Sequence, residues 1–281
     1  MPSRYTATNA ENYERLMGRW SPLLARELIA WAGLGPGERV LDVGCGTGSL
    51  ALALAARPEP AAIVGIDIAE PYVAYAASRS ADPRLSFRTG DAVALDLPEA
   101  GFDRCFSQLA LNFMSEPARA VAAMRRVTRA GGLVAAAVWD FPGGLVYQRI
   151  FWDTAAALDP AAERARARHY SSPLTAPGEL EAAFRAAGLG EISTCSLTIR
   201  IEYRDFADYW EPIENAQGPV GDYVRQLAPD QLSSLAAAVR RAYLAGAADG
   251  PRSMAATAWA ARGIVPNAVP PAARDAVRRD R

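Results

Sequence analysis

The sequence contains no lysine, so all 30 of its basic residues are arginines. Guanidinium groups stay charged near neutral pH, which excludes enzymes that use a lysine nucleophile or form a Schiff base with their substrate. The 31 acidic residues bring the net charge to −1. A protein that holds a long stretch of nucleic acid usually has a basic excess, so we expect no nucleic-acid partner.

Cysteine is scarce as well. The three cysteines, Cys45, Cys105 and Cys195, are far apart and form no C-x-x-C pair, so we expect neither a disulfide framework nor a metal site. No apolar stretch near the start resembles a secretory signal, and no apolar run is long enough to span a bilayer. These absences predict a protein of the reducing cytoplasm with no membrane partner.

The first half of the chain alternates between short apolar strands and helices. Strands are expected at 39–43, 62–66, 85–89, 102–108 and 133–139, and helices at 9–32 (broken near Pro22), 49–56, 71–79 and 117–126. Continuous apolar strands that alternate with helices are typical of a parallel sheet covered by helices on both faces.

The second half departs from this alternation. We expect helices at 146–158, 179–187, 205–210 and 231–245, an irregular polar stretch at 159–175, and two long strands at 191–203 and 253–262. The predicted fold class is therefore α/β: a doubly wound, mostly parallel seven-stranded sheet with helices on both faces and a helical cap. The last two strands should pair with each other, one of them antiparallel to the rest.

The loop after the first strand carries the strongest motif, Asp42-Val43-Gly44-Cys45-Gly46-Thr47-Gly48. Its glycines remove side chains where the backbone approaches a ligand, and the helix that follows offers unpaired N–H groups. Dinucleotide-binding loops have the spacing G-x-G-x-x-G, whereas this loop has G-x-G-x-G. Asp67 ends the second strand about 20 residues further on, where an acidic side chain accepts both hydroxyls of a ribose. Asp91 follows the third strand.

This stretch, from Val40 to Gly48, resembles the first motif of the class I (seven-stranded, Rossmann-like) S-adenosylmethionine-dependent methyltransferases, and the resemblance extends from about residue 39 to residue 139. It implies that Gly44, Gly46 and the adjoining backbone at Cys45 contact the methionyl part of the cofactor. Asp42 would help to position that part, or would only hold the loop by hydrogen bonds; both interpretations stay open, and the Cys45 side chain is expected to pack rather than react.

The resemblance also assigns the later strand ends. It implies that Asp67 binds the ribose, that Ile68 packs on the adenine, and that Asp91 receives the adenine amine, with Ala92 beside it in the cofactor site. Gln108 and Leu109, just past the fourth strand, are the candidates for contacts near the reacting groups. The Asp/Asn-Pro-Pro-aromatic signature of amino-methylating nucleic-acid enzymes is missing there, which favours a small-molecule acceptor.

Three further groups of residues have two interpretations each. Tyr13 and Arg19, beside Trp20, would close a lid over the cofactor, or the aromatic pair would only pack the first helix onto the core. His169, the only histidine, would act as a general base or would be a solvated lid residue. The cap aromatics would line an acceptor pocket or form the cap's own core, and these are Tyr147, Trp152, Tyr170 and Trp210.

The domain division that follows is an N-terminal helical lid at 1–33, a cofactor-binding core at 34–140 and a cap insertion at 141–178. The rest of the sheet would occupy 179–265, with a helical insertion at 204–250, before a flexible tail at 266–281. The predicted function is in-line methyl transfer to oxygen, nitrogen or carbon of a small molecule, leaving S-adenosylhomocysteine. Two rivals are a relative that binds the cofactor without methylating (cyclase-like or regulatory) and a nicotinamide-dependent oxidoreductase.

Overall fold

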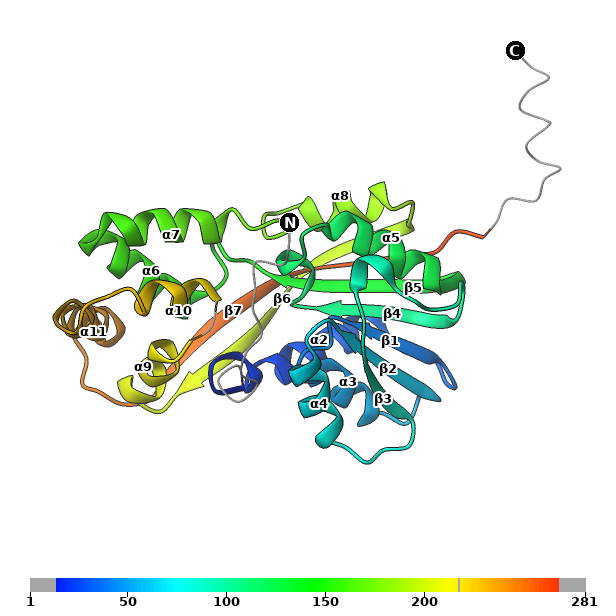
Figure 1. Cartoon of the computed structure of the whole chain (residues 1–281), viewed down its shortest axis with the longest axis horizontal. Coiled ribbons are helices and arrows are strands. Elements are labelled where there is room, and N and C mark those ends of the chain that lie inside the picture. Colours follow the sequence, from blue (N-terminus) through cyan, green and yellow to red (C-terminus); the bar gives the residue numbers. More distant parts are fainter. Residues whose placement is uncertain (1–13, 217, 268–281) are drawn as a thin grey trace, which may run out of the picture.

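A single mixed sheet forms the centre of the protein, whose computed structural model describes residues 14–216 and 218–267 (Figure 1). Within these residues the sheet has seven strands in the order β3-β2-β1-β4-β5-β7-β6. The strands are β1 (Arg39–Val43), β2 (Ala62–Asp67), β3 (Leu85–Thr89), β4 (Phe102–Gln108), β5 (Thr128–Trp139), β6 (Gly190–Tyr203) and β7 (Arg252–Ile264). The first five strands pair in parallel, and β7 is antiparallel to both β5 and β6. The predicted fold class, with one antiparallel strand, is confirmed.

Helices cover both faces of this sheet. They are η1 (Glu14–Gly18), α2 (Ser21–Ala32), α3 (Ser49–Ala55), α4 (Glu70–Ser78), η2 (Ala92–Ala94), η3 (Leu111–Phe113), α5 (Pro117–Val127), α6 (Val146–Leu158), α7 (Pro160–Tyr170), α8 (Glu179–Ala186), α9 (Phe206–Glu214), α10 (Gly218–Val224) and α11 (Pro229–Leu244). The core residues of α2 and α3 belong to one apolar cluster, and those of α5 and α8 to another. In β1, Val40 packs in the first cluster, whereas Leu41 and Val43 pack in the second. Both faces of β1 are therefore buried, as is typical of a strand inside a parallel sheet.

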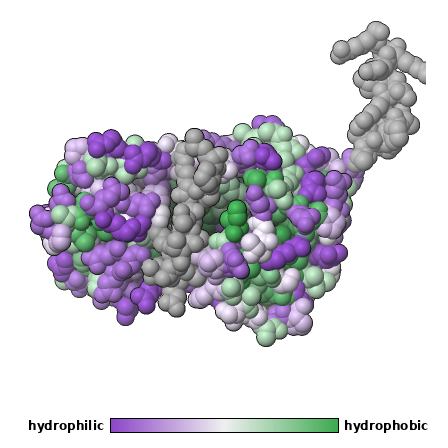
Figure 2. Space-filling model, in the orientation of Figure 1, coloured by the Kyte–Doolittle hydropathy of each residue, from purple (hydrophilic) through white to green (hydrophobic). Residues whose placement is uncertain are grey.

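The cap is built on the extensions of the last two strands. β5 pairs with β7 only as far as Trp139 opposite Ala258, whereas β6 and β7 continue together to Tyr203 opposite Arg252. The helices α6, α7, α9, α10 and α11 gather around this extension, away from α3 and α4 (Figure 1). Its visible surface is mainly hydrophilic, so the apolar side chains of the cap lie inside (Figure 2).

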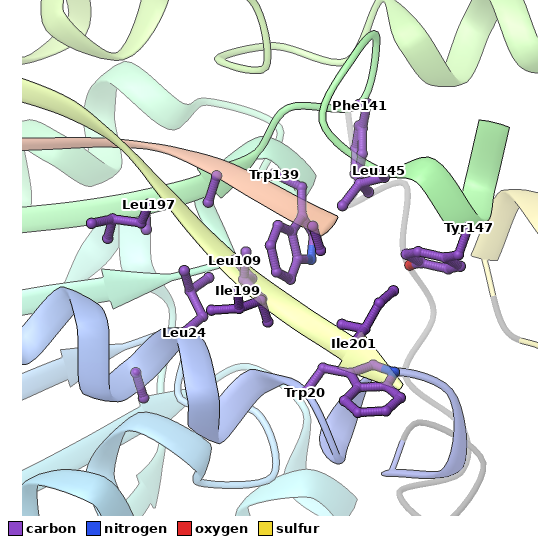
Figure 3. Packing of buried hydrophobic residues seen from close by; sticks show 14 of the residues in the cluster. Trp20, Leu24, Leu109, Trp139, Phe141, Leu145, Tyr147, Leu197, Ile199 and Ile201 are labelled. Carbon is purple, nitrogen blue, oxygen red and sulfur yellow. The ribbon is translucent and has the colours of Figure 1, made fainter. Parts of the chain in front are cut away.

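One apolar cluster joins the cap to the sheet (Figure 3). Ile199 and Ile201 of β6 lie between the α2 side, where Trp20 is found, and Trp139 at the end of β5 (Figure 3). The same cluster includes Trp210 of α9. Burial of large apolar side chains contributes roughly 1.5–3 kcal/mol each, so this shared core fixes the cap over one edge of the sheet.

The prediction of an irregular stretch at 159–175 is wrong, because residues Pro160–Tyr170 form α7. The Asp159 side chain accepts a hydrogen bond from the N–H of Ala161 over 2.8 Å, which caps the helix, and Pro160 occupies its first turn. Alanine and arginine, which fill the helix, are strong helix formers. The proline therefore begins a helix here and does not mark a loop.

Two other helices differ from the prediction. α9 continues through Pro212 to Glu214, although the expected helix ends at residue 210. α10 was not expected from a sequence with two glycines and a proline, and Tyr223 and Val224, both buried, hold it against the cap. The expected residues 9–13 of the first helix, the lid residue Tyr13 and most of the tail at 266–281 lie outside the described residues. Among the described helices, none has the length and apolarity needed to cross a bilayer.

Candidate active site

One cavity of about 390 Å³ lies where the carboxyl ends of the parallel strands face the cap. Its volume falls in the range of small-molecule sites. From the sheet it is lined by the predicted residues Gly44, Gly46, Asp67, Ile68, Asp91, Ala92, Gln108 and Leu109. From the other side α6, α7 and α10 contribute Gln148, His169 and Val220. Eight of the candidate residues and His169, far apart in the sequence, thus share one space.

The glycine loop is held closely against its neighbours. The N–H groups of Gly44 and Cys45 both donate to the carbonyl oxygen of Ile66, over 2.7 and 3.0 Å. Gly44 has a φ of +73°, and a Cβ added there would collide with the Cβ of Ala110. Only glycine fits this position, because other residues avoid positive φ and have no room here. The loop therefore presents bare backbone to the cavity.

Asp67 connects this loop to the end of β2. Its Oδ2 accepts a hydrogen bond from the N–H of Gly46 over 2.9 Å, and its Oδ1 accepts one from the N–H of Ala69, also over 2.9 Å. Burial raises the pKa of this carboxyl, and hydrogen bonds from the backbone of Ala69, Gly46 and Ile68 oppose that shift. A carboxylate has about four acceptor sites, so Asp67 keeps acceptor capacity for a ligand.

Asp42 is 1% exposed and lies beneath the loop without lining the cavity. Its Oδ2 accepts a hydrogen bond from the N–H of Ala51 over 3.1 Å, whereas its Oδ1 has no partner among the described residues. Burial raises its pKa to about 8, and the nearby charge of Asp67 adds to the shift. Burial likewise raises the pKa of the Cys45 thiol well above its usual value. A buried thiol of this kind packs and does not react.

The mouth of the cavity carries an exposed apolar side chain. Ile68 is 65% exposed, the highest value among the large exposed hydrophobic residues described. Asp91 follows β3, and its Oδ1 accepts a hydrogen bond from the N–H of Val93 over 2.9 Å. Both residues line the cavity, as does Ala92. An apolar surface beside a carboxylate suits a flat heterocycle with an exocyclic amine.

The end of β4 joins the cavity to α2. Gln108 is 9% exposed, and its Nε2 donates to the carbonyl oxygen of Ser21 over 3.0 Å, while its Oε1 has no partner among the described residues. Leu109 has a φ of +58°. Non-glycine residues in this left-handed region cost energy and tend to be retained at functional sites.

Arg19 is placed apart from the cavity lining. Its Nη1 lies 2.9 Å from Oδ1 of Asp208, and its guanidinium group lies over the rings of Trp20 and Tyr203, 4.4 and 5.0 Å from their centroids. This group therefore joins the start of α2 to α9. Whether Arg19 also serves the expected lid stays a prediction.

His169 is buried, with 6% exposure, so the interpretation as a solvated residue is wrong. It lines the cavity from α7, and its Nε2 lies 2.8 Å from Oε1 of Gln148. Burial lowers its pKa to about 4, so the imidazole is neutral at neutral pH. Trp152, Tyr147 and Trp210 are buried and absent from the cavity lining, which favours the interpretation that they form the cap's core.

Several lining residues were not predicted. Trp139 ends β5 at the same edge as Asp67, so the strand pattern could have indicated it. The others come from the first turn, the helices and the cap, whose placement depends on tertiary packing: they include Leu16, Met17, Tyr72, Phe113, Met114, Phe141, Gln148, Pro219 and Val220. The described residues bring no three His, Cys, Asp or Glu side chains together in a group able to hold a metal.

Comparison with known proteins identifies a methyltransferase domain in this chain. Residues 41–136 match a family model described as a methyltransferase domain. Nocamycin O-methyltransferase from Saccharothrix syringae is 28% identical over 246 residues, which cover 81% of this chain and 85% of that protein. Demethylmenaquinone methyltransferase from Thermus thermophilus is 35% identical over 123 residues, but these cover only 41% of this chain and 54% of that protein.

Solved structures share the fold at lower identity. The YcgJ protein from Bacillus subtilis superposes with a TM-score of 0.56 at 18% identity, covering 88% of this chain and 99% of that one. The matched segment contains the glycine loop and every sheet-side residue of the cavity up to Leu109. The chain therefore contains a methyltransferase domain, and it resembles S-adenosylmethionine-dependent methyltransferases in sequence and fold.

Proposed function

We propose that S-adenosylmethionine binds along the sheet side of the cavity and donates its methyl group to a small molecule held on the cap side. The observation that carries this proposal is that one cavity is bordered at once by the glycine loop and by the cap. When bound, the cofactor supplies an electrophilic methyl group on a sulfonium. Positioning of the acceptor behind that methyl group is worth up to about 7–11 kcal/mol of the barrier.

The residues present fit this cofactor. Asp67 lines the cavity, and its carboxylate would accept hydrogen bonds from the ribose hydroxyls. Ile68 offers an exposed apolar surface for the adenine, and Asp91 with Ala92 lies beside it. The backbone of Gly44 and Gly46 would border the methionyl part, with Gln108 and Leu109 near the sulfur.

We also propose the acceptor atom, the division of the chain and the place of action. The resemblance to O-methyltransferases supports an acceptor oxygen, although nitrogen and carbon are the other possible acceptor atoms. We propose the division of the chain into lid, core and cap given above, and a reducing cytoplasm as the place of action, which suits the three free cysteines Cys45, Cys105 and Cys195.

Hydrogen exchange with and without S-adenosylhomocysteine tests the proposed site. We expect slower exchange at the amides of Gly46, Ile68 and Val93, and no change in α11, which does not border the cavity. Protection confined to other segments would contradict the site. Titration with NADH under the same conditions provides the comparison for an oxidoreductase.

Methyl transfer itself is followed by mass spectrometry. The protein is incubated with cofactor that carries a trideuterated methyl group and with 2-naphthol, 2-naphthylamine or indole. A mass gain on one probe identifies oxygen, nitrogen or carbon as the acceptor atom. Binding of S-adenosylhomocysteine without transfer to any of them would favour the non-methylating relative.

A further inference from the structure

We propose that the acceptor is a neutral, largely apolar molecule that carries a hydroxyl group, and that Nδ1 of His169 takes the proton of this hydroxyl during transfer. This inference rests on the proposed function. It assigns a role to the only histidine of the chain and narrows the substrate class of the cap side of the cavity.

A chain of hydrogen bonds defines which nitrogen of His169 carries the proton. The Tyr147 hydroxyl donates to Sδ of Met17 over 2.8 Å, and Nε2 of Gln148 donates to the Tyr147 oxygen over 3.0 Å. This orients the amide so that its Oε1 faces His169, with 2.8 Å to Nε2 of the ring. Because an amide oxygen only accepts, Nε2 must carry the hydrogen, and the neutral ring keeps its lone pair on Nδ1.

The Nδ1 atom is buried and has no hydrogen-bond partner among the described residues. The ring packs near Phe141, Tyr170 and Trp152, with 4.1, 5.8 and 6.1 Å between ring centroids. A buried acceptor without a donor costs about 1–3 kcal/mol, so this arrangement is stabilised by a ligand that brings an O–H group. His169 belongs to the lining of the same cavity as Asp67 and Gly44.

The charge of the cavity lining restricts the rest of the acceptor. The chain has 30 arginines, yet none of them is among the described residues that line the cavity. Its carboxylates, Asp67 and Asp91, belong to the proposed cofactor side. The other side is mostly apolar and includes Met17, Phe113 and Val220. A carboxylate or phosphate on the acceptor would find no counter-charge there, and burial of an unpaired charge is costly.

The proposed step balances. A lone pair of the acceptor oxygen forms the new O–CH₃ bond while the S–CH₃ bond breaks, and the sulfur keeps that bonding pair and becomes a neutral thioether. The proton of the hydroxyl moves to Nδ1 of His169, so the positive charge passes from sulfur to the imidazolium. Because burial disfavours the charged ring, the imidazolium then returns the proton to solvent.

Nitrogen NMR of the single histidine tests the proposal directly, since its signals need no assignment among several residues. In protein saturated with S-adenosylhomocysteine, the spectrum should show hydrogen on Nε2 and a bare Nδ1. Addition of 2-naphthol should shift the Nδ1 signal toward that of a hydrogen-bonded nitrogen, whereas the anion 2-naphthoate should not. An unchanged Nδ1 signal with saturating 2-naphthol, or an equal shift with both probes, would overturn the proposal.

Two substitutions separate proton transfer from packing. His169→Asn keeps a polar atom near the position of Nδ1, and His169→Gln keeps one near Nε2, but neither amide can take a proton. For transfer to 2-naphthol, kcat should fall by about 100-fold or more in both variants, and KM should change by less than about threefold in His169→Asn. A kcat within about threefold of wild type in either folded variant would also overturn the proposal.

The outcomes distinguish this inference from the proposed function. If S-adenosylhomocysteine does not bind, the proposed function fails before His169 is tested. If S-adenosylhomocysteine instead slows hydrogen exchange in the glycine loop while 2-naphthol leaves the nitrogen signals of His169 unchanged, the proposed function stands and the proposed role of His169 is wrong.

Discussion

The Oδ2 atom of Asp67 accepts a hydrogen bond from the backbone N–H of Gly46 over 2.9 Å, across 21 positions of sequence. The end of β2 thereby holds the centre of the glycine loop in place. A carboxylate that positions the loop and also faces the cavity couples the backbone around the proposed methionyl site to the proposed ribose site. A change at Asp67 is therefore expected to affect both.

Two variants of Asp42 distinguish between its possible roles, which are to position the cofactor or to hold the loop by hydrogen bonds. Its folded-state pKa of about 8 lies above the ordinary value of 3.8, so its proton favours the fold and that contribution is lost as pH rises through this window. Asp42→Asn keeps an acceptor for the N–H of Ala51 and should equal or exceed the stability of wild type at pH 8. Asp42→Ala should be less stable than Asp42→Asn by about 1–3 kcal/mol.

Urea unfolding of both variants at several pH values measures this difference. Equal stability of the two variants would contradict a loop-holding role. A loss of S-adenosylhomocysteine affinity in Asp42→Asn, without a loss of stability, would instead favour a role of the carboxylate in positioning the cofactor.

The buried His169 predicts a dependence of stability on pH. Its folded-state pKa of about 4 lies below the ordinary value of 6.5, so the unfolded chain binds the proton more readily between these values. The free energy of unfolding should therefore fall as pH decreases from 6.5 toward 4, by on the order of 3 kcal/mol from this group. His169→Gln should lose that part of the dependence. An identical pH profile in the variant would show that the ring is solvated.

Local sequence patterns predicted the sheet well, for a physical reason. β1 and β2 are short, mainly apolar segments, and Gly44 follows the first while Asp67 ends the second, so a few adjacent residues were enough to predict their positions. The polar stretch before Tyr170 was misinterpreted, because a proline begins a helix or interrupts one depending on its neighbours. α10 depends on buried contacts of Tyr223, which no local pattern contains.

The cavity residues likewise divide into those that local sequence predicts and those that only tertiary packing brings together. The sheet-side residues were predicted because they follow strands whose carboxyl ends meet at one edge. The partners of His169 were not, since Gln148 lies 21 positions away on another helix and only the packing of α6 against α7 brings them together. The pairing of Arg19 with Asp208 spans 189 positions and has no local signal at all.

Gly33 provides a control for the substitution of Gly44 in the glycine loop. Both have positive φ, +73° and +77°, but an added Cβ meets Ala110 at Gly44 and nothing within 4 Å at Gly33. Both alanine variants should lose about 1–3 kcal/mol from backbone strain, and Gly44→Ala should lose more because of the collision with Ala110. Only Gly44→Ala should also weaken S-adenosylhomocysteine binding, measured by calorimetry. Equal affinity in the two variants would contradict the loop assignment.

Arg19→Gln tests whether this arginine serves the cofactor. Its side chain is paired with Asp208 and packed on Trp20, so the variant should lose about 1 kcal/mol of stability. The affinity for S-adenosylhomocysteine should stay within about threefold of wild type. Asp208→Asn should match it in both measurements. An affinity loss of about tenfold or more in Arg19→Gln alone would support the lid role instead.

Calorimetric titration of S-adenosylhomocysteine into wild type and Asp67→Asn tests the central claim, with Asp103→Asn as the control. Asp103 also accepts a backbone N–H, from Arg39, but lies outside the cavity lining. Hydrogen bonds to charged groups are worth about 1.5–3 kcal/mol, so Asp67→Asn should bind about 10- to 100-fold more weakly than wild type, while Asp103→Asn binds normally. Unchanged affinity in Asp67→Asn, with the protein folded, would contradict the assignment of this cavity to the cofactor.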